Sequence, residues 1–129
     1  MRLNPRRLER PARRACLALA VAGVLYLVWR FDLTGLPAEG CSPVARFAPG
    51  ESLIVDRRPS DWTAGDAAFF AGPDGRLHLG LVERTRHVDG ALEVWTTTDA
   101  LDCPGVGSEE LGWIPRRRLR GRVVMIWPW

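Results

Sequence analysis

An uncharged stretch near the start of the sequence constrains this chain more than any other feature. Residues 15–29, ACLALAVAGVLYLVW, carry no charge, and arginines stand directly before and after them. As a helix the stretch would cover about 22 Å at ~1.5 Å per residue, which is short of the ~30 Å hydrocarbon core of a bilayer. Flanking arginines can extend it by snorkelling, and Tyr26, Trp29 and Phe31 are typical interfacial residues. We therefore predict a single transmembrane anchor over residues 15–31.

Two other interpretations of this stretch are a cleaved signal peptide and a buried core helix. A cleaved signal peptide should be followed by a small-x-small cleavage site, and Leu36-Pro37-Ala38 is a poor one. A buried core helix would not normally follow so many arginines, because residues 1–14 contain six Arg and one Glu and so carry a net charge of +5. The positive-inside rule places this basic tail in the cytoplasm and residues 31–129 on the outer, periplasmic or extracellular face of the inner membrane.

Charge also limits the class of partner. Residues 15–129 hold twelve Arg and fourteen acids, a net charge of −2, so the basic balance comes from the tail. A nucleic-acid-binding domain would need positive charge on its folded surface. We therefore expect no nucleic-acid partner, and expect the bilayer to be one partner of the chain. The oligomeric state is left open.

The rest of the chain has the pattern of a small all-β domain. We assign residues 32–40 to a linker and residues 41–129 to a domain of about six strands separated by turn signals. Ala71-Gly-Pro-Asp-Gly75 and Asp89-Gly90 are strong turn sequences. The expected strands are 52–56, 66–70, 76–85, 91–97, 111–114 and 119–127, and the last two are expected to form a two-strand unit. A small β-barrel or folded sheet beside a membrane is the predicted architecture.

Cysteine placement fits an outward-facing domain. Cys16 lies in the anchor, whereas Cys41 and Cys103 would meet an oxidising compartment, where they either pair or stay free. Nothing in their spacing resembles a zinc site. No metal or cofactor is indicated.

The ordered motifs of the β region resemble the S26 signal peptidase family. Ser108-Glu-Glu-Leu111-Gly112-Trp-Ile114-Pro115, followed by Gly121-Arg122-Val-Val, is similar to that family's C-terminal signature. Ser42-Pro-Val-Ala-Arg-Phe-Ala-Pro49-Gly50-Glu51 has the spacing of its nucleophile box, although Pro43, Ala45 and Arg46 depart from the family's residues. Gly65-Asp66 and Thr98-Asp99-Ala100 fall where the family has further motifs. The resemblance covers about residues 40–127 and implies a signal-peptidase-like β fold behind a single anchor.

The resemblance also implies roles for four residues. Ser42 takes the position of the nucleophile and Glu83 that of the general base, while Asp99 and Ser108 take supporting positions. A serine needs a neighbouring base to become nucleophilic, and the chain contains no lysine, so the family's Ser-Lys dyad is impossible here. Glu83 is a weak base unless burial raises its pKa. The alternative is that Glu83 is a surface residue or forms a salt bridge with Arg84 or Arg86.

Other residues are candidates for the same chemistry. His87 shares strand parity with Glu83 but lies about 13 Å further along, at ~3.3 Å per residue. His78 has the opposite parity and would need a bulge to reach the same face. Cys41 is a further candidate nucleophile without an apparent basic partner. Asp99 and Ser108 are equally suited to holding turns.

Two functions from different classes follow. The first is a membrane-anchored, signal-peptidase-like serine endopeptidase that cleaves exported precursors with an atypical or missing base. The second is a catalytically inactive relative that binds an extended peptide or a membrane partner. A weaker third interpretation is a subunit of an envelope complex that uses the fold only for packing. No cofactor is required by any of them.

Overall fold

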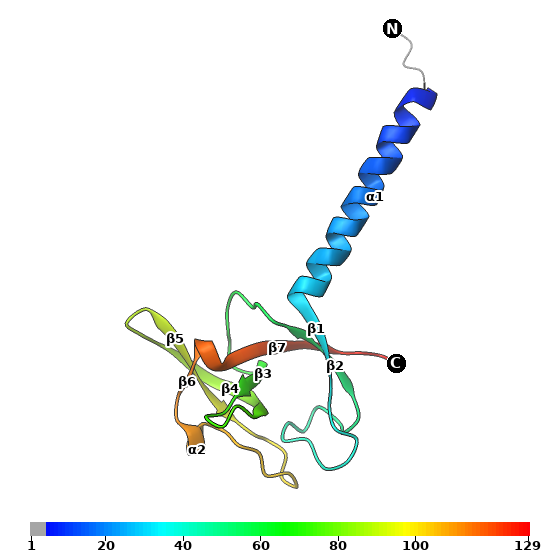
Figure 1. Cartoon of the computed structure of the whole chain (residues 1–129). Helices are drawn as coiled ribbons and strands as arrows, with labels where there is room; N and C mark the ends of the chain where they lie inside the picture. The colour runs from blue at the N-terminus through cyan, green and yellow to red at the C-terminus, as the bar shows by residue number, and fades with distance from the viewer. Residues whose placement is uncertain (1–4) are drawn as a thin grey trace. The chain divides into compact units, whose positions relative to one another are not determined.

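The computed structural model describes residues 5–129 and divides the chain into two compact units, Met1–Phe31 and Asp32–Trp129. The first unit contains the helix α1 (Pro5–Arg30), whose first residues belong to the basic segment (Figure 1). Its stretch Glu9–Arg30 has 22 residues and a mean hydropathy of 1.5, with none of its most apolar window buried. At ~1.5 Å per residue that stretch covers about 33 Å. It is therefore long and apolar enough to cross a membrane.

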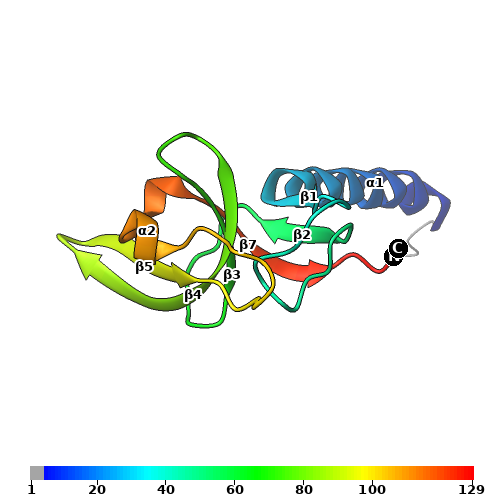
Figure 2. The ribbon, with the colours of Figure 1, turned by 90° about the horizontal axis from the view of Figure 1, so that it is seen from below.

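The second unit is mainly β, as the turn signals and strand patterns predicted. Seven strands form one curled sheet in the order β1-β2-β7-β3-β4-β5-β6 (Figure 2). Every pairing from β2 to β6 along this order is antiparallel. The strands are β1 (Phe31–Gly35), β2 (Ser52–Asp56), β3 (Ala67–Ala71), β4 (Leu77–Val88), β5 (Ala91–Thr97), β6 (Ile114–Pro115) and β7 (Leu119–Ile126).

Three features differ from the sequence-based prediction. The expected linker 32–40 supplies most of β1, an edge strand of the sheet. The expected strand 111–114 is the end of a one-turn helix, α2 (Ser108–Leu111), followed by the two-residue β6. The two C-terminal strands do not pair with one another. The 3₁₀ turn η1 (Arg116–Arg118) lies between them, and each strand has other partners. β6 joins β5, and β7 enters the sheet between β2 and β3.

Strand β3 lies at the centre of the packing, because all five of its residues are buried. Side chains alternate between the two faces of a strand, and Phe69 and Phe70 accordingly belong to different core clusters. The Phe69 cluster includes Val44, Phe47 and Leu79, and so ties the segment after Ser42 to the sheet. The Phe70 cluster covers the other face. Both faces of β3 are therefore apolar, which explains why its sequence, AAFFA, does not alternate with polar residues.

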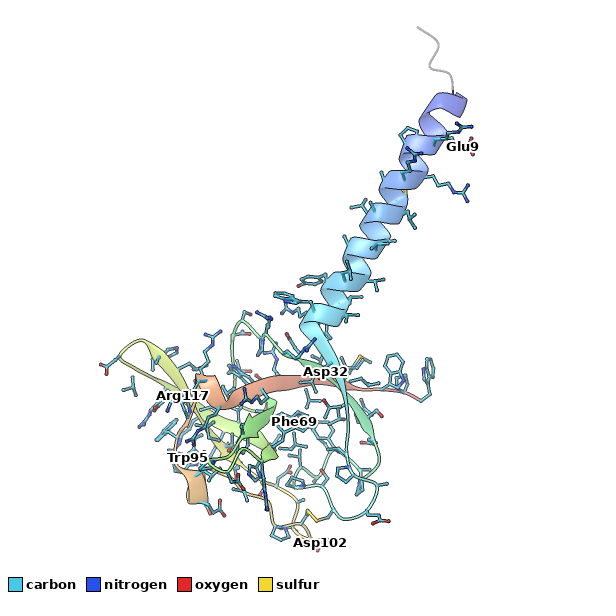
Figure 3. All side chains as sticks on the ribbon, in the orientation of Figure 1. Glu9, Asp32, Phe69, Trp95, Asp102 and Arg117 are labelled. Atoms are coloured by element: carbon cyan, nitrogen blue, oxygen red, sulfur yellow. A yellow bond between two sulfur atoms is a disulfide. The ribbon has the colours of Figure 1, made fainter. Side chains whose placement is uncertain are left out.

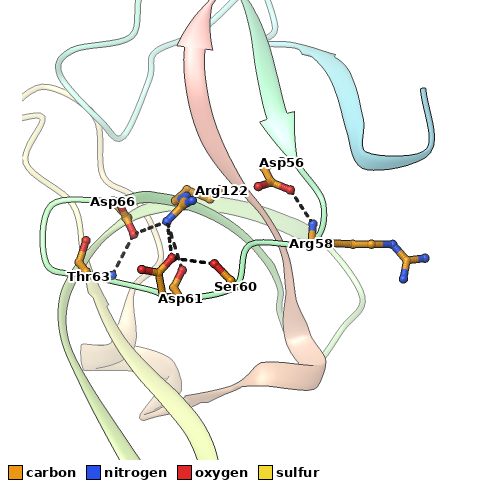
Figure 4. A network of polar contacts seen from close by, with 7 residues as sticks. All are labelled: Asp56, Arg58, Ser60, Asp61, Thr63, Asp66 and Arg122. Atoms are coloured by element: carbon orange, nitrogen blue, oxygen red, sulfur yellow. Dashed lines mark hydrogen bonds and ion pairs between the residues drawn. The ribbon is translucent and has the colours of Figure 1, made fainter. Parts of the chain in front are cut away.

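Gly121 and Arg122 match part of the C-terminal signature that resembles the S26 family. Both have a structural role in this sheet. A Cβ at Gly121 would collide with Val55 and lie 2.9 Å from the Asp56 carbonyl oxygen, so only glycine lets β7 approach β2. Arg122 reaches the loop after β2: its Nη1 lies 3.4 Å from Asp61 Oδ1 and 3.5 Å from Asp66 Oδ2 (Figure 4). Asp66 also accepts a hydrogen bond from Thr63 N. The network holds the 57–66 loop against the sheet.

Candidate functional site

Ser42 lies in a loop that is fixed at two points. Cys41 and Cys103 form a disulfide bond, visible beside Asp102 in Figure 3. On the other side of the serine, the Asp99 carboxylate accepts a hydrogen bond from Ala45 N at 2.8 Å. The backbone N–H groups of Asp99 and Ala100 both donate to the Pro43 carbonyl oxygen at 3.2 Å. The 41–45 and 99–103 segments are therefore held together as one rigid loop pair.

The loop pair brings Ser42 and Asp99 into one neighbourhood, but the carboxylate is bonded to the backbone of Ala45. The Ser42 hydroxyl donates to Val44 O at 2.9 Å, and Val44 N lies 3.4 Å from Ser42 Oγ. This is a local turn of the kind that serine side chains commonly make with their own backbone. Within residues 5–129 these two contacts are the hydrogen bonds of the Ser42 hydroxyl.

Two hollows meet at Ser42. The first has a volume of about 580 Å³ and the second about 550 Å³, and Cys41, Ser42, Pro49 and Cys103 line both. The first is lined by residues 34–37, 41–43, 77–79 and 103–106 together with Pro49 and Phe69. The second is lined by residues 40–42, 45, 47–49 and 99–103. The first hollow is mainly apolar, with prolines, leucines and Phe69 in its wall.

Glu83 lies apart from both hollows. It is exposed and is the extra residue of a bulge, because Val82 pairs with Thr96 and Arg84 pairs with Trp95. It has no ion pair with its arginine neighbours in the described part of the chain. Arg84 stacks over Trp95 at 4.9 Å from the ring centroid, and Arg86 binds Glu93 at 2.7 Å. The Ser42–Glu83 arrangement that the resemblance implies has no support in these contacts.

The two histidines occupy different places along β4. His78 borders the first hollow, yet its ring centroid lies 5.6 Å from that of Phe70, which belongs to the core cluster on the face opposite Phe69. His87 is exposed and pairs with Leu92 near the hairpin turn. The bulge at Glu83 resets the alternation of β4, so a count of parity from Glu83 to His87 does not hold. Neither imidazole forms a hydrogen bond with Ser42 in the described structure.

Ser108 is almost completely buried and serves β5. Its Oγ accepts a hydrogen bond from Thr96 N at 2.8 Å and lies 3.4 Å from Thr96 Oγ1. It lines neither of the hollows at Ser42. The serine therefore completes the hydrogen bonding of a buried strand residue.

Replacing Ser108 tests this structural role. In Ser108→Ala the buried Thr96 N–H loses its acceptor, and we expect the free energy of unfolding to fall by ~1–3 kcal/mol. The midpoint of urea unfolding of the full chain in detergent measures the change. Glu109→Ala, an exposed position on the same helical turn, is the matched control and should leave the midpoint in place. An unchanged midpoint in Ser108→Ala would contradict the role.

Several residues of the site gave little signal in the sequence. Gly105 is one: a Cβ there would lie 2.6 Å from both Pro43 Cβ and Thr98 Cγ2, so glycine permits the close approach of the two loops. Leu77 and Leu79 line the first hollow, and their alternation within the predicted strand was the available clue. Within residues 5–129 no three His, Cys, Asp or Glu side chains gather as a metal site.

Comparison with known proteins adds no relative to this description. The chain shows no match to protein-family models, to curated proteins or to solved structures. The features that bear on function are therefore the geometry at Ser42 and the apolar helix.

Proposed function

We propose that this chain is a membrane-anchored binding module that holds an extended, apolar peptide segment in the first hollow beside Ser42. The observation that carries the proposal is the hollow itself, about 580 Å³ and mainly apolar, bordered by the edge strand β1. An edge strand offers unpaired backbone groups to an extended peptide, and adjacent pockets accept its alternate side chains. The S26-like motifs of the sequence agree with a peptide ligand.

The membrane arrangement is part of the same proposal. We infer that α1 spans the bilayer with its arginine-rich end in the cytoplasm, following the positive-inside rule. The β unit then lies on the outer face. The Cys41–Cys103 disulfide supports this side, because disulfides persist in oxidising compartments.

Leu77 provides the test of peptide binding. It lines the first hollow and is 53% exposed, so a larger polar side chain can be tolerated there without loss of the fold. In Leu77→Arg a guanidinium enters the apolar hollow, and we expect affinity to fall on the order of tenfold, ~1.4 kcal/mol. Fluorescence anisotropy of a labelled, soluble heptapeptide with alternating apolar side chains measures it, using the full chain in nanodiscs.

The matched control for this test lies on the same strand. Val88 is 42% exposed at the far end of β4 and lines neither hollow at Ser42. Val88→Arg should therefore bind the peptide as the parent chain does, and empty nanodiscs give the background. Equal affinities for the Leu77→Arg variant and the parent chain would rule out the hollow as the binding site.

A signal-peptidase-like serine endopeptidase is the second candidate, favoured by the position of Ser42 at the meeting of two hollows. Under the binding proposal, the parent chain leaves a precursor with a small-x-small site intact. Ser42→Ala should bind the heptapeptide about as the parent chain does, because the Ser42 hydroxyl is already hydrogen-bonded to the Val44 backbone. Gel analysis of the precursor after incubation with the full chain distinguishes the binding module from the peptidase. Cleavage that disappears in Ser42→Ala would replace the binding module with the peptidase.

A further inference from the structure

The end of β7 exposes apolar side chains in a region without charge. Residues 123–129, VVMIWPW, contain no ionisable side chain. Val124 is 53% exposed and Met125 51%, while Ile126 and Trp127 are 38% and 39% exposed. Val124, Met125 and Ile126 line one hollow together, although side chains alternate between the faces of a strand. Exposed apolar side chains gathered in this way mark an interaction surface.

The patch is held in place by the sheet. Met125 and Ile126 pair with Ile54 and Leu53 of β2, and Trp127 N donates a hydrogen bond to Ser52 O at 2.7 Å. The Trp127 and Trp129 rings contact each other edge to face, with centroids 6.0 Å apart. The exposed apolar surface is therefore a built feature of β7 and the residues after it.

We propose that this apolar end of β7 lies in the headgroup region of the bilayer, as a second membrane contact of the chain in addition to the α1 span. The inference rests on the membrane arrangement of the proposed function. β1 begins at Phe31, directly after the last residue of α1. If α1 spans the bilayer, the first residue of β1 therefore lies at the membrane surface. β7 is two strands from β1 in the sheet, about 10 Å at ~4.8 Å per strand. Its apolar end lies across β2 from the second half of β1, since Leu36 N donates to Glu51 O and Trp127 N donates to Ser52 O. Leu33 of β1, which is 56% exposed, is a further exposed apolar side chain at the β1 end of the sheet.

The chemistry of the patch suits lipid. Tryptophan is enriched at membrane interfaces because its ring is apolar and its N–H is polar. Arg46 lines a hollow of about 330 Å³ with Met125 and Ile126, and so places a cation beside the apolar side chains, where phosphate groups would lie. Asp66 lines the same hollow, but its carboxylate is already bonded to Thr63 N and Arg122.

Site-directed spin labelling of the full chain in phospholipid vesicles tests the contact. The background variant is Cys16→Ala, which removes the free cysteine and keeps the Cys41–Cys103 disulfide. Three single-cysteine labels are compared: Met125→Cys in the patch, Ala22→Cys in the apolar part of α1, and Leu101→Cys, whose native side chain is fully exposed in the loop beside the disulfide. Collision rates with oxygen and with a water-soluble nickel chelate report lipid and water exposure.

We expect the labels at 22 and 125 to collide mainly with oxygen and the label at 101 mainly with the nickel chelate. Replacing both Trp127 and Trp129 with Ser should shift the label at 125 toward water. A lipid-exposed label at 22 with a water-exposed label at 125 would overturn this inference and leave the anchor intact. A water-exposed label at 22 would overturn the anchor as well. A label at 125 shielded from both reagents would indicate a second protein copy on the patch, and would also overturn the inference.

Discussion

Removal of the Cys41–Cys103 disulfide should lower the free energy of unfolding by ~4 kcal/mol. The bond joins two residues with a sequence separation of 62. In the chain-entropy model, closing a loop of this length lowers the conformational entropy of the unfolded chain and so destabilises the unfolded state by ~4 kcal/mol. The double variant Cys41→Ala/Cys103→Ala has no such constraint. We expect a large drop in its urea midpoint, measured by tryptophan fluorescence of the full chain in detergent.

The same experiment has an internal control in the third cysteine. Cys16 is free, so Cys16→Ala should unfold at the midpoint of the parent chain. Adding reductant to the parent chain should reproduce the loss seen in the double variant. A double variant as stable as the parent chain would show that the cross-link does not stabilise the loop pair at Ser42.

Phe70→Ala should destabilise the β unit by ~3–5 kcal/mol, the usual cost of removing a buried phenylalanine. Phe70 is fully buried on β3 and packs with Trp62, Val82, Val94 and Ile114. Because its cluster lies on the face of β3 opposite Phe69, the loss falls mainly on the side of the sheet away from Phe69 and Leu79, which line the first hollow. The urea midpoint measures the loss.

Comparison with a milder substitution distinguishes a loss of stability caused by a packing cavity from one caused by misfolding. Phe70→Leu keeps most of the buried volume and should lose less stability than Phe70→Ala. Both variants should still bind the heptapeptide at urea-free conditions, since Phe69 and Leu79 remain in the wall of the hollow. Equal losses in the two variants would contradict a cavity as the cause.

Local chemistry made several strands predictable. β2 and β5 begin and end at the expected residues, 52–56 and 91–97, because turn-forming residues flank both segments in the sequence. The Asp89-Gly90 turn is the clearest case: both residues have positive φ, 51° and 78°, as a tight hairpin requires. The membrane-length helix was equally visible, because charge is absent over fifteen residues.

Long-range packing decided what the sequence did not reveal. β1 is short and mostly exposed, so it has no apolar alternation to distinguish it from a linker. A single turn such as α2 is too brief for a helical period. The insertion of β7 between β2 and β3 depends on residues far apart in the chain, and Gly121 was its only local trace.

The candidate site was predictable in part. The resemblance to the S26 family implied that Ser42 and Asp99 belong to one site, and both line the second hollow. Their chemical roles remain predictions. Glu83 was assigned from its position in a motif, whereas the bulge that carries it is set by the pairing of β4 with β5. Hydrogen bonds such as those of Ser42 with Val44 depend on loop geometry, which spacing alone does not specify.

The two ends of the sheet differ in their capacity to recruit another strand. β6 has only two residues, and one of them, Pro115, has no backbone N–H to donate. β1 has five residues and is the other end of the sheet order. Strand addition is thus confined to one end, so two copies that met through β1 would form a closed pair whose outer edges are both β6. Edge-to-edge pairing between copies of the β unit is thereby restricted to the β1 end of the sheet.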